Sequence, residues 1–86
     1  MNPLQRQNAE RFVEYLKWNG RKIYLRPEVY ADLREHSRLY YCDVQQVISC
    51  LHRIGCIDIQ TGGAWAVVQL LSDDVDRWAG IRKGAQ

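Results

Sequence analysis

The most informative stretch of the chain runs from Val44 to Ile57 and reads VQQVISCLHRIGCI. Its apolar side chains recur every three or four residues, which is the period of an amphipathic helix. Gly55 is typical of a helix end, because glycine adopts a left-handed backbone conformation there without steric cost. Residues 37–42 lack this period and indicate a turn, after which Asp43 suits the first turn of a helix. The stretch therefore predicts a helix over 43–54 that leads through glycine directly into a strand.

Two further helices are predicted before this stretch, with a short strand between them. The first covers 4–18, where helical spacing gathers on one face the side chains of Ala9, Phe12, Val13 and Leu16. The second covers 27–38, because Pro27 suits the first position of a helix, where its missing N–H costs nothing. Between the two helices, residues 21–25 alternate between polar and apolar types and predict a brief strand.

A β-hairpin is predicted over 56–71. Polar and apolar side chains alternate over 56–60, whereas the run 64–71 is more continuously apolar, as in a strand covered on both faces near its end. The Thr-Gly-Gly sequence between the two runs tolerates the positive φ angles of a tight hairpin. The acidic residues that follow favour the first turn of a terminal helix over 73–81.

Composition and charge place the chain among ordinary globular proteins. Hydrophobic residues make up 47% of it and charged residues 26%, which is unlike a disordered chain. No apolar run approaches the roughly 20 residues that cross a bilayer, and the polar N-terminus lacks a signal-peptide core. Three cysteines without paired spacing indicate free thiols. We therefore expect a soluble, non-secreted protein of the cytoplasm, or of the nucleus in a eukaryote, with no membrane partner.

No constellation of residues indicates catalysis or metal binding. Cys50, His52 and Cys56, with Cys42 upstream, match none of the paired-ligand spacings of zinc sites. The sequence has no nucleophile elbow and no phosphate-binding glycine loop. His36 is expected to be a packed or half-exposed member of the second helix. The prediction is a protein with no metal, no cofactor and no enzymatic activity.

The predicted order of elements is helix, strand, helix, helix, strand, strand, helix. Together with the junction from Val47 through Gly55 to Ile57, this order resembles the winged helix-turn-helix superfamily over nearly the whole chain. The resemblance implies one α+β domain over 1–86, in which a three-helix core carries a β-hairpin wing. It also implies binding of double-stranded DNA, with the third helix in the major groove and the wing at the backbone or minor groove.

The residues of a DNA interface follow from this resemblance. The outer side of the third helix carries Gln45, Gln46, Ser49 and Arg53. Glutamine can bond adenine through two hydrogen bonds, and arginine can bond guanine or a phosphate. Phosphate contacts are expected from Arg34 and Arg38 of the second helix, with added positive charge from residues 21–26. The wing tip has no Lys or Arg and offers Thr61 and backbone N–H groups.

Three aromatic residues are expected outside the core. Tyr15 and Trp18 lie off the apolar stripe of the first helix, and Trp78 lies on a terminal helix that has little else to bury. Exposed aromatic patches usually mark partner surfaces. We therefore predict a homodimer contact between the two terminal helices.

Two functions remain open from the sequence. The first is sequence-specific binding of double-stranded DNA by a small transcriptional regulator. The second is a winged-helix protein–protein interaction module in a larger assembly, without DNA binding. The net charge of only +2, the surplus of aromatic residues and the uncharged wing tip favour the second.

Overall fold

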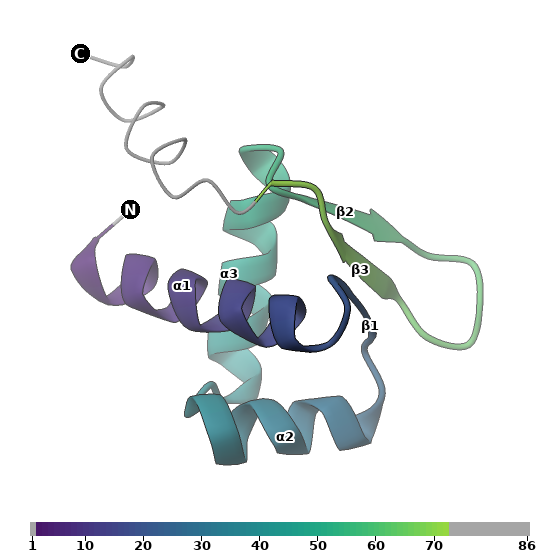
Figure 1. The fold of residues 1–86 in the computed structure, drawn as a ribbon, viewed down its shortest axis with the longest axis horizontal. Helices are drawn as coiled ribbons and strands as arrows, with labels where there is room; N and C mark the ends of the chain where they lie inside the picture. Colours follow the sequence, from purple (N-terminus) through teal and green to yellow (C-terminus); the bar gives the residue numbers. More distant parts are fainter. Residues whose placement is uncertain (1, 73–86) are drawn as a thin grey trace.

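Helix α1 opens the computed structural model, which describes residues 2–72 (Figure 1). The helix spans Pro3–Trp18, where the sequence predicts 4–18. A capping box stabilises its start: Gln5 N donates to Asn2 Oδ1 at 2.8 Å, and Asn2 N donates to Gln5 Oε1 at 3.1 Å. The helix ends at Asn19, and Gly20 follows with φ of +76°.

Strand β1 and helix α2 follow, at Lys22–Tyr24 and Pro27–Ser37. The turn after α2 uses Arg38 in a left-handed conformation, with φ of 56°. The backbone N–H groups of Arg38 and Leu39 both donate to the carbonyl of Leu33, so the turn is closed by hydrogen bonds. Leu39 is buried in the core and anchors this turn.

Helix α3 spans Tyr41–Arg53 and begins two residues before the predicted start. The prediction of a turn through residue 42 is therefore wrong. Asp43 is the third residue of the helix, and its carboxylate reaches back to accept from Tyr40 N at 3.1 Å. The sequence correctly predicted that Asp43 lies in the first turn of the helix, but this turn begins two residues earlier than predicted.

Strands β2 and β3 span Ile57–Gln60 and Val67–Leu70 and complete a three-stranded antiparallel sheet in the order β1-β3-β2. Ile23 and Ile59 are both paired with Val68 of the central strand, on the face that packs on the core. Three residues form the opposite row across the sheet: Lys22, Gln69 and Asp58. The molecule is thus α+β, with three helices and a small antiparallel sheet in its described part.

The prediction of one long strand over 64–71, covered on both faces, is wrong. β3 starts only at Val67, and Trp65 lies in the preceding loop with 45% of its surface exposed. Gln69 is exposed between the buried Val68 and Leu70. The strand therefore alternates and packs on the core through one face, because no described helix covers the other.

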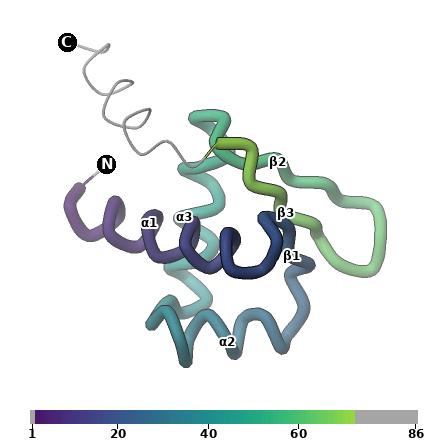
Figure 2. Tube along the Cα trace, in the orientation of Figure 1, coloured from purple at the N-terminus to yellow at the C-terminus, as the bar shows by residue number. Residues whose placement is uncertain are grey.

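The three helices and the sheet share one core (Figures 1 and 2). α1 crosses α3 and also contacts α2 and β3. The side chains with essentially no exposed surface include Phe12, Leu16, Leu33 and Leu51. Figure 2 shows how the end of β3 returns beside the end of α3.

The end of α3 and the end of β3 are joined through Cys56, which is fully buried. Cys56 N donates to Leu51 O at 2.9 Å, and the Cys56 carbonyl accepts from Leu71 N at 2.8 Å and Ser72 N at 3.2 Å. Gly55, with φ of +82°, makes the reversal between helix and strand. The hairpin is thus held at its base against the helix that precedes it.

No helix within residues 2–72 has the length and apolar character needed to span a membrane. The predicted terminal helix over 73–81, with Trp78, lies outside the described residues.

Candidate nucleic-acid interface

The outer face of α3 is set by its buried face. Val44, Val47, Ile48 and Leu51 all lie in the core. A helix turns about 100° per residue, so the opposite side centres on Gln46, Ser49 and Arg53, with Cys42 beside them. The sequence prediction and the observed exposure agree here: every one of the four predicted residues of α3, Gln45 included, is exposed.

Gln45 lies apart from the centre of this face. Its side-chain amide donates to the hydroxyl of Tyr30 on α2 at 2.8 Å. Tyr30 in turn packs against Tyr41, with ring centroids 5.1 Å apart and a 39° angle between the rings. Gln45 therefore belongs to a polar and aromatic seam between α2 and α3, which also presents the exposed ring of Tyr41.

Arg53 lies at the last turn of α3 with its guanidinium folded along the helix. Arg53 Nη2 donates to Cys50 Sγ at 3.6 Å. This contact uses one of five N–H donors, so the side chain keeps donors for a second partner. In the part of the chain that the structure describes, the two ion pairs, Arg6–Glu10 and Lys17–Glu14, both lie on α1.

The two predicted phosphate contacts of α2 separate. Arg34 is exposed one turn after Tyr30, on the flank of α2 that borders α3. Arg38 instead lies near Arg11, at the end of a groove between α1 and α2. The structure thus places Arg34 on the flank of α2 that meets α3, and Arg38 in the groove between α1 and α2.

A basic and aromatic patch lies on β1 and the residue before α2. Lys22 Nζ lies 5.9 Å and Arg26 Cζ 5.4 Å from the centroid of the Tyr24 ring, and both distances are within the range of a cation–π contact. Ile23 is buried, so Lys22 and Tyr24 point away from the core. The sequence prediction included the cations but missed Tyr24, and also Tyr30 and Tyr41. The alternation around Ile23 is the signal that points to Tyr24.

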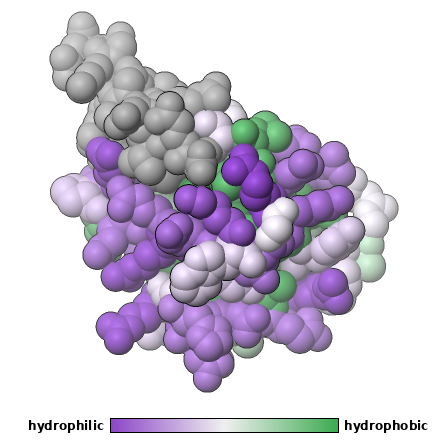
Figure 3. Space-filling view, viewed as in Figure 1, coloured by the Kyte–Doolittle hydropathy of each residue, from purple (hydrophilic) through white to green (hydrophobic). Residues whose placement is uncertain are grey.

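The hairpin tip carries little charge. Thr61 and Trp65 are both exposed in the loop over 61–66. The face of the molecule formed by α1 and α2 is also mostly polar. Figure 3 shows a largely hydrophilic surface there, with hydrophobic side chains in small separate areas. A surface of this kind differs from the large apolar patches of obligate protein interfaces.

The predicted dimer contact needs a correction at Tyr15. Its side chain has only 7% of its surface exposed, and its hydroxyl donates to Asp32 Oδ2 at 3.3 Å. Burial, with a further contribution from the charge of Asp32, raises the pKa of the Tyr15 hydroxyl above its ordinary value. Trp18 is 81% exposed, and Trp78 lies outside the described residues. Tyr15 therefore belongs to the core, and the expectation that its ring lies outside the core is wrong.

The cysteines and histidines do not converge. Cys42 is exposed, Cys50 is half-buried and Cys56 is buried. His36, expected to be packed or half-exposed on α2, is exposed. Over residues 2–72 no three His, Cys, Asp or Glu side chains form a group that can hold a metal ion.

Comparison with known proteins yields no match: no family model, no curated protein and no solved structure is significantly similar to this chain.

Proposed function

We propose that this chain is a winged helix-turn-helix protein that binds double-stranded DNA and reads its sequence with α3, as a small transcriptional regulator. The observation that supports this most is the exposed outer face of α3, with Gln46, Ser49 and Arg53 at its centre. A helix of 13 residues is about 20 Å long, and the major groove, about 12 Å wide, admits a helix of this kind.

The spacing of these three residues suits a run of bases. Gln46, Ser49 and Arg53 lie at i, i+3 and i+7, so they span about 10 Å along the helix axis. Base pairs are stacked about 3.4 Å apart, so this length covers about three of them. Glutamine can read adenine, arginine can read guanine, and serine can bond several bases.

Other exposed side chains are suited to phosphate contacts. Arg34 and the hydroxyl of Tyr41 border the outer face of α3, and the patch of Lys22, Tyr24 and Arg26 adds two cations. Such contacts position a protein on DNA without reading its sequence. The sheet order β1-β3-β2, with a hairpin directly after α3, is also the arrangement expected of a winged helix.

Two copies on two half-sites, about one turn of DNA apart, would give the sequence specificity of a regulator. Of the residues predicted for the dimer contact, Trp18 is the exposed one within the described part. Sedimentation at high micromolar concentration tests the dimer, and a monomer there contradicts it.

The test of DNA binding is selection of a site from random double-stranded DNA, followed by affinity measurements on variants. Arg53→Ala is expected to weaken binding to the selected site by about 1–3 kcal/mol and to relax specificity at one base pair. Arg6→Ala removes the same charge from α1 and serves as the matched control, with little expected change. Unchanged affinity in a variant with alanine at 46, 49 and 53 would refute the assignment of α3.

A protein-interaction module is the second candidate. It is favoured by the exposed rings of Trp18 and Trp65 and by a hairpin tip without Lys or Arg. Retention on heparin across a salt series separates the two candidates. Binding to DNA or heparin weakens steeply as the salt concentration rises, because the release of counterions that drives it becomes less favourable. Failure to bind heparin or DNA at low salt supports the module.

A further inference from the structure

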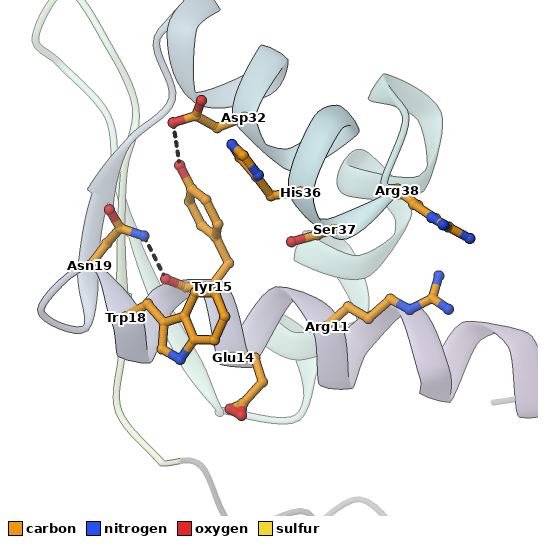
Figure 4. A pocket seen from close by; sticks show the side chains of 9 residues that line it. All are labelled: Arg11, Glu14, Tyr15, Trp18, Asn19, Asp32, His36, Ser37 and Arg38. Carbon is orange, nitrogen blue, oxygen red and sulfur yellow. Dashed lines mark hydrogen bonds between the residues drawn. The ribbon is translucent and has the colours of Figure 1, made fainter.

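In the described part of the chain, a groove lies between α1 and α2 (Figure 4). Its volume of about 650 Å³ lies within the range of small-molecule sites. The flank of α2 that lines it, with Asp32 and His36, is opposite the flank that meets α3 through Tyr30. The groove is therefore separate from the proposed DNA-reading face.

One end of the groove is aromatic and held in place by hydrogen bonds. Trp18 presents an indole that is 81% exposed, beside the buried ring of Tyr15. The Tyr15 hydroxyl donates to Asp32 Oδ2 at 3.3 Å, and Asn19 Nδ2 donates to the Tyr15 carbonyl at 2.8 Å. A planar ring can stack on this indole without displacing a core side chain.

The other end is cationic. Figure 4 shows the guanidinium groups of Arg11 and Arg38 at the same end, across the groove from each other. Within residues 2–72 neither has a carboxylate at ion-pair distance. Two guanidinium groups that line the same end of one groove suit a dianionic phosphate, which offers three oxygens for bidentate contacts.

The distance between the two ends restricts the ligand. Arg11 and Trp18 are seven residues apart, which is two turns or about 10 Å along α1. A ring that bears its anionic group directly is too short to reach both ends, whereas a sugar between base and phosphate supplies the length. Asp32 keeps Oδ1 to accept from an exocyclic amino group, as adenine has, near the aromatic end.

From these contacts we propose that the groove binds a purine nucleoside monophosphate, with its base on Trp18 and its phosphate on Arg11 and Arg38. The ligand would contact both α1 and α2, and so join the two helices. This proposal does not depend on DNA binding.

The test is titration of the ¹⁵N-labelled full chain with AMP, followed in amide spectra. We expect shifts of the amide signals of residues 11–19 and 32–38 and of the indole N–H signal of Trp18. The variant Trp18→Ala assigns this indole signal, because the signal is missing from its spectrum. Adenosine has the ring alone and ribose 5-phosphate the anion alone, so each should bind about tenfold more weakly than AMP or worse.

Variants locate the contacts. The double variant Arg11→Gln with Arg38→Gln is expected to weaken AMP binding about tenfold or more and to bring AMP and adenosine close together in affinity. Arg34→Gln also removes a cation from α2 but lies outside the groove, so it should bind AMP as the parent does. Arg34 and Arg38 are exposed and Arg11 is half-buried, so the variants should leave the parent amide spectrum otherwise intact.

Three results would overturn the proposal: no shifts with millimolar AMP, equal binding of AMP and ribose 5-phosphate, or shifts confined to α3. The last result would place the nucleotide on the proposed DNA face and leave DNA binding untouched. Loss of DNA binding in the α3 variants has no bearing on the groove, so the two proposals fail separately.

Discussion

The side-chain amide of Gln45 on α3 is hydrogen-bonded at 2.8 Å to the hydroxyl of Tyr30 on α2. The neighbouring Gln46 points about 100° away from it around the helix, into the centre of the exposed face. Two adjacent glutamines thus have different surroundings: one is tied to the next helix, and the other is open to a partner.

This difference predicts unequal effects on DNA affinity. Gln46→Ala should weaken binding to the selected site by about 1–3 kcal/mol, as for a side chain that reads a base. Gln45→Ala should cost less, because its amide is already bonded to Tyr30 before DNA arrives. Fluorescence anisotropy with labelled DNA measures both variants, and a larger loss for Gln45→Ala would reverse the assignment.

Tyr15 and Phe12 should contribute to stability to different extents. Tyr15→Phe removes a hydroxyl bonded to an exposed carboxylate at 3.3 Å, so we expect a loss of about 1 kcal/mol in the free energy of unfolding. Phe12→Ala leaves a cavity at a fully buried position and should cost about 3–5 kcal/mol. Urea unfolding gives both values. A loss of several kcal/mol for Tyr15→Phe would mean that the Asp32 contact is stronger than its length indicates.

Stability should fall at alkaline pH because two tyrosines hold their protons more firmly in the folded chain. Burial, followed by the charge of Asp32, raises the pKa of Tyr15, and burial, followed by Tyr41, raises that of Tyr30. Above pH 10 the unfolded chain loses these protons first, so the free energy of unfolding decreases as pH rises.

Urea unfolding from about pH 8 to about pH 11 measures this decrease, and Tyr15→Phe and Tyr30→Phe are each expected to make it shallower. Tyr24→Phe is the control, because Tyr24 is exposed. An unchanged slope in both the Tyr15 and the Tyr30 variant would contradict the prediction.

Gly55 should be sensitive to substitution because of its backbone. Its φ of +82° is unfavourable for a residue with a Cβ atom, so Gly55→Ala should destabilise the chain by about 1 kcal/mol or more. Gly63→Ala is the matched control, since a Cβ there meets its nearest atom, Trp65 O, only at 4.0 Å. Thermal unfolding compares the two, and equal midpoints would show that the reversal tolerates alanine.

Helix α3 was predictable because period and burial coincide there. Its apolar residues recur at helical spacing, and all four between 44 and 51 lie in the core. The start of α3 was not predictable, because Tyr40, the residue before it, does not have one of the side chains that usually cap a helix. The carboxylate that stabilises the start belongs to Asp43, three residues further on.

Tyr15 and Trp65 show what local pattern cannot give. Tyr15 lies off the apolar stripe of α1, yet Asp32, seventeen residues later, satisfies its hydroxyl beside the core. Trp65 belongs to an apolar run, yet the pairing of Val67 with Tyr24 and Gln60 places the strand start after it. Both outcomes depend on contacts between distant parts of the chain, as does the groove between α1 and α2.

The loop between β2 and β3 has a practical consequence. Residues 61–65 are exposed, and the pairing of Gln60 with Val67 closes the loop at its base. Extra residues inserted near Gly62 would therefore lengthen the tip at small entropic cost, while the register of the sheet stays in place. This makes the tip the natural position for a fluorescent label or an affinity tag, and the place where the chain can accept new length during evolution without refolding its core.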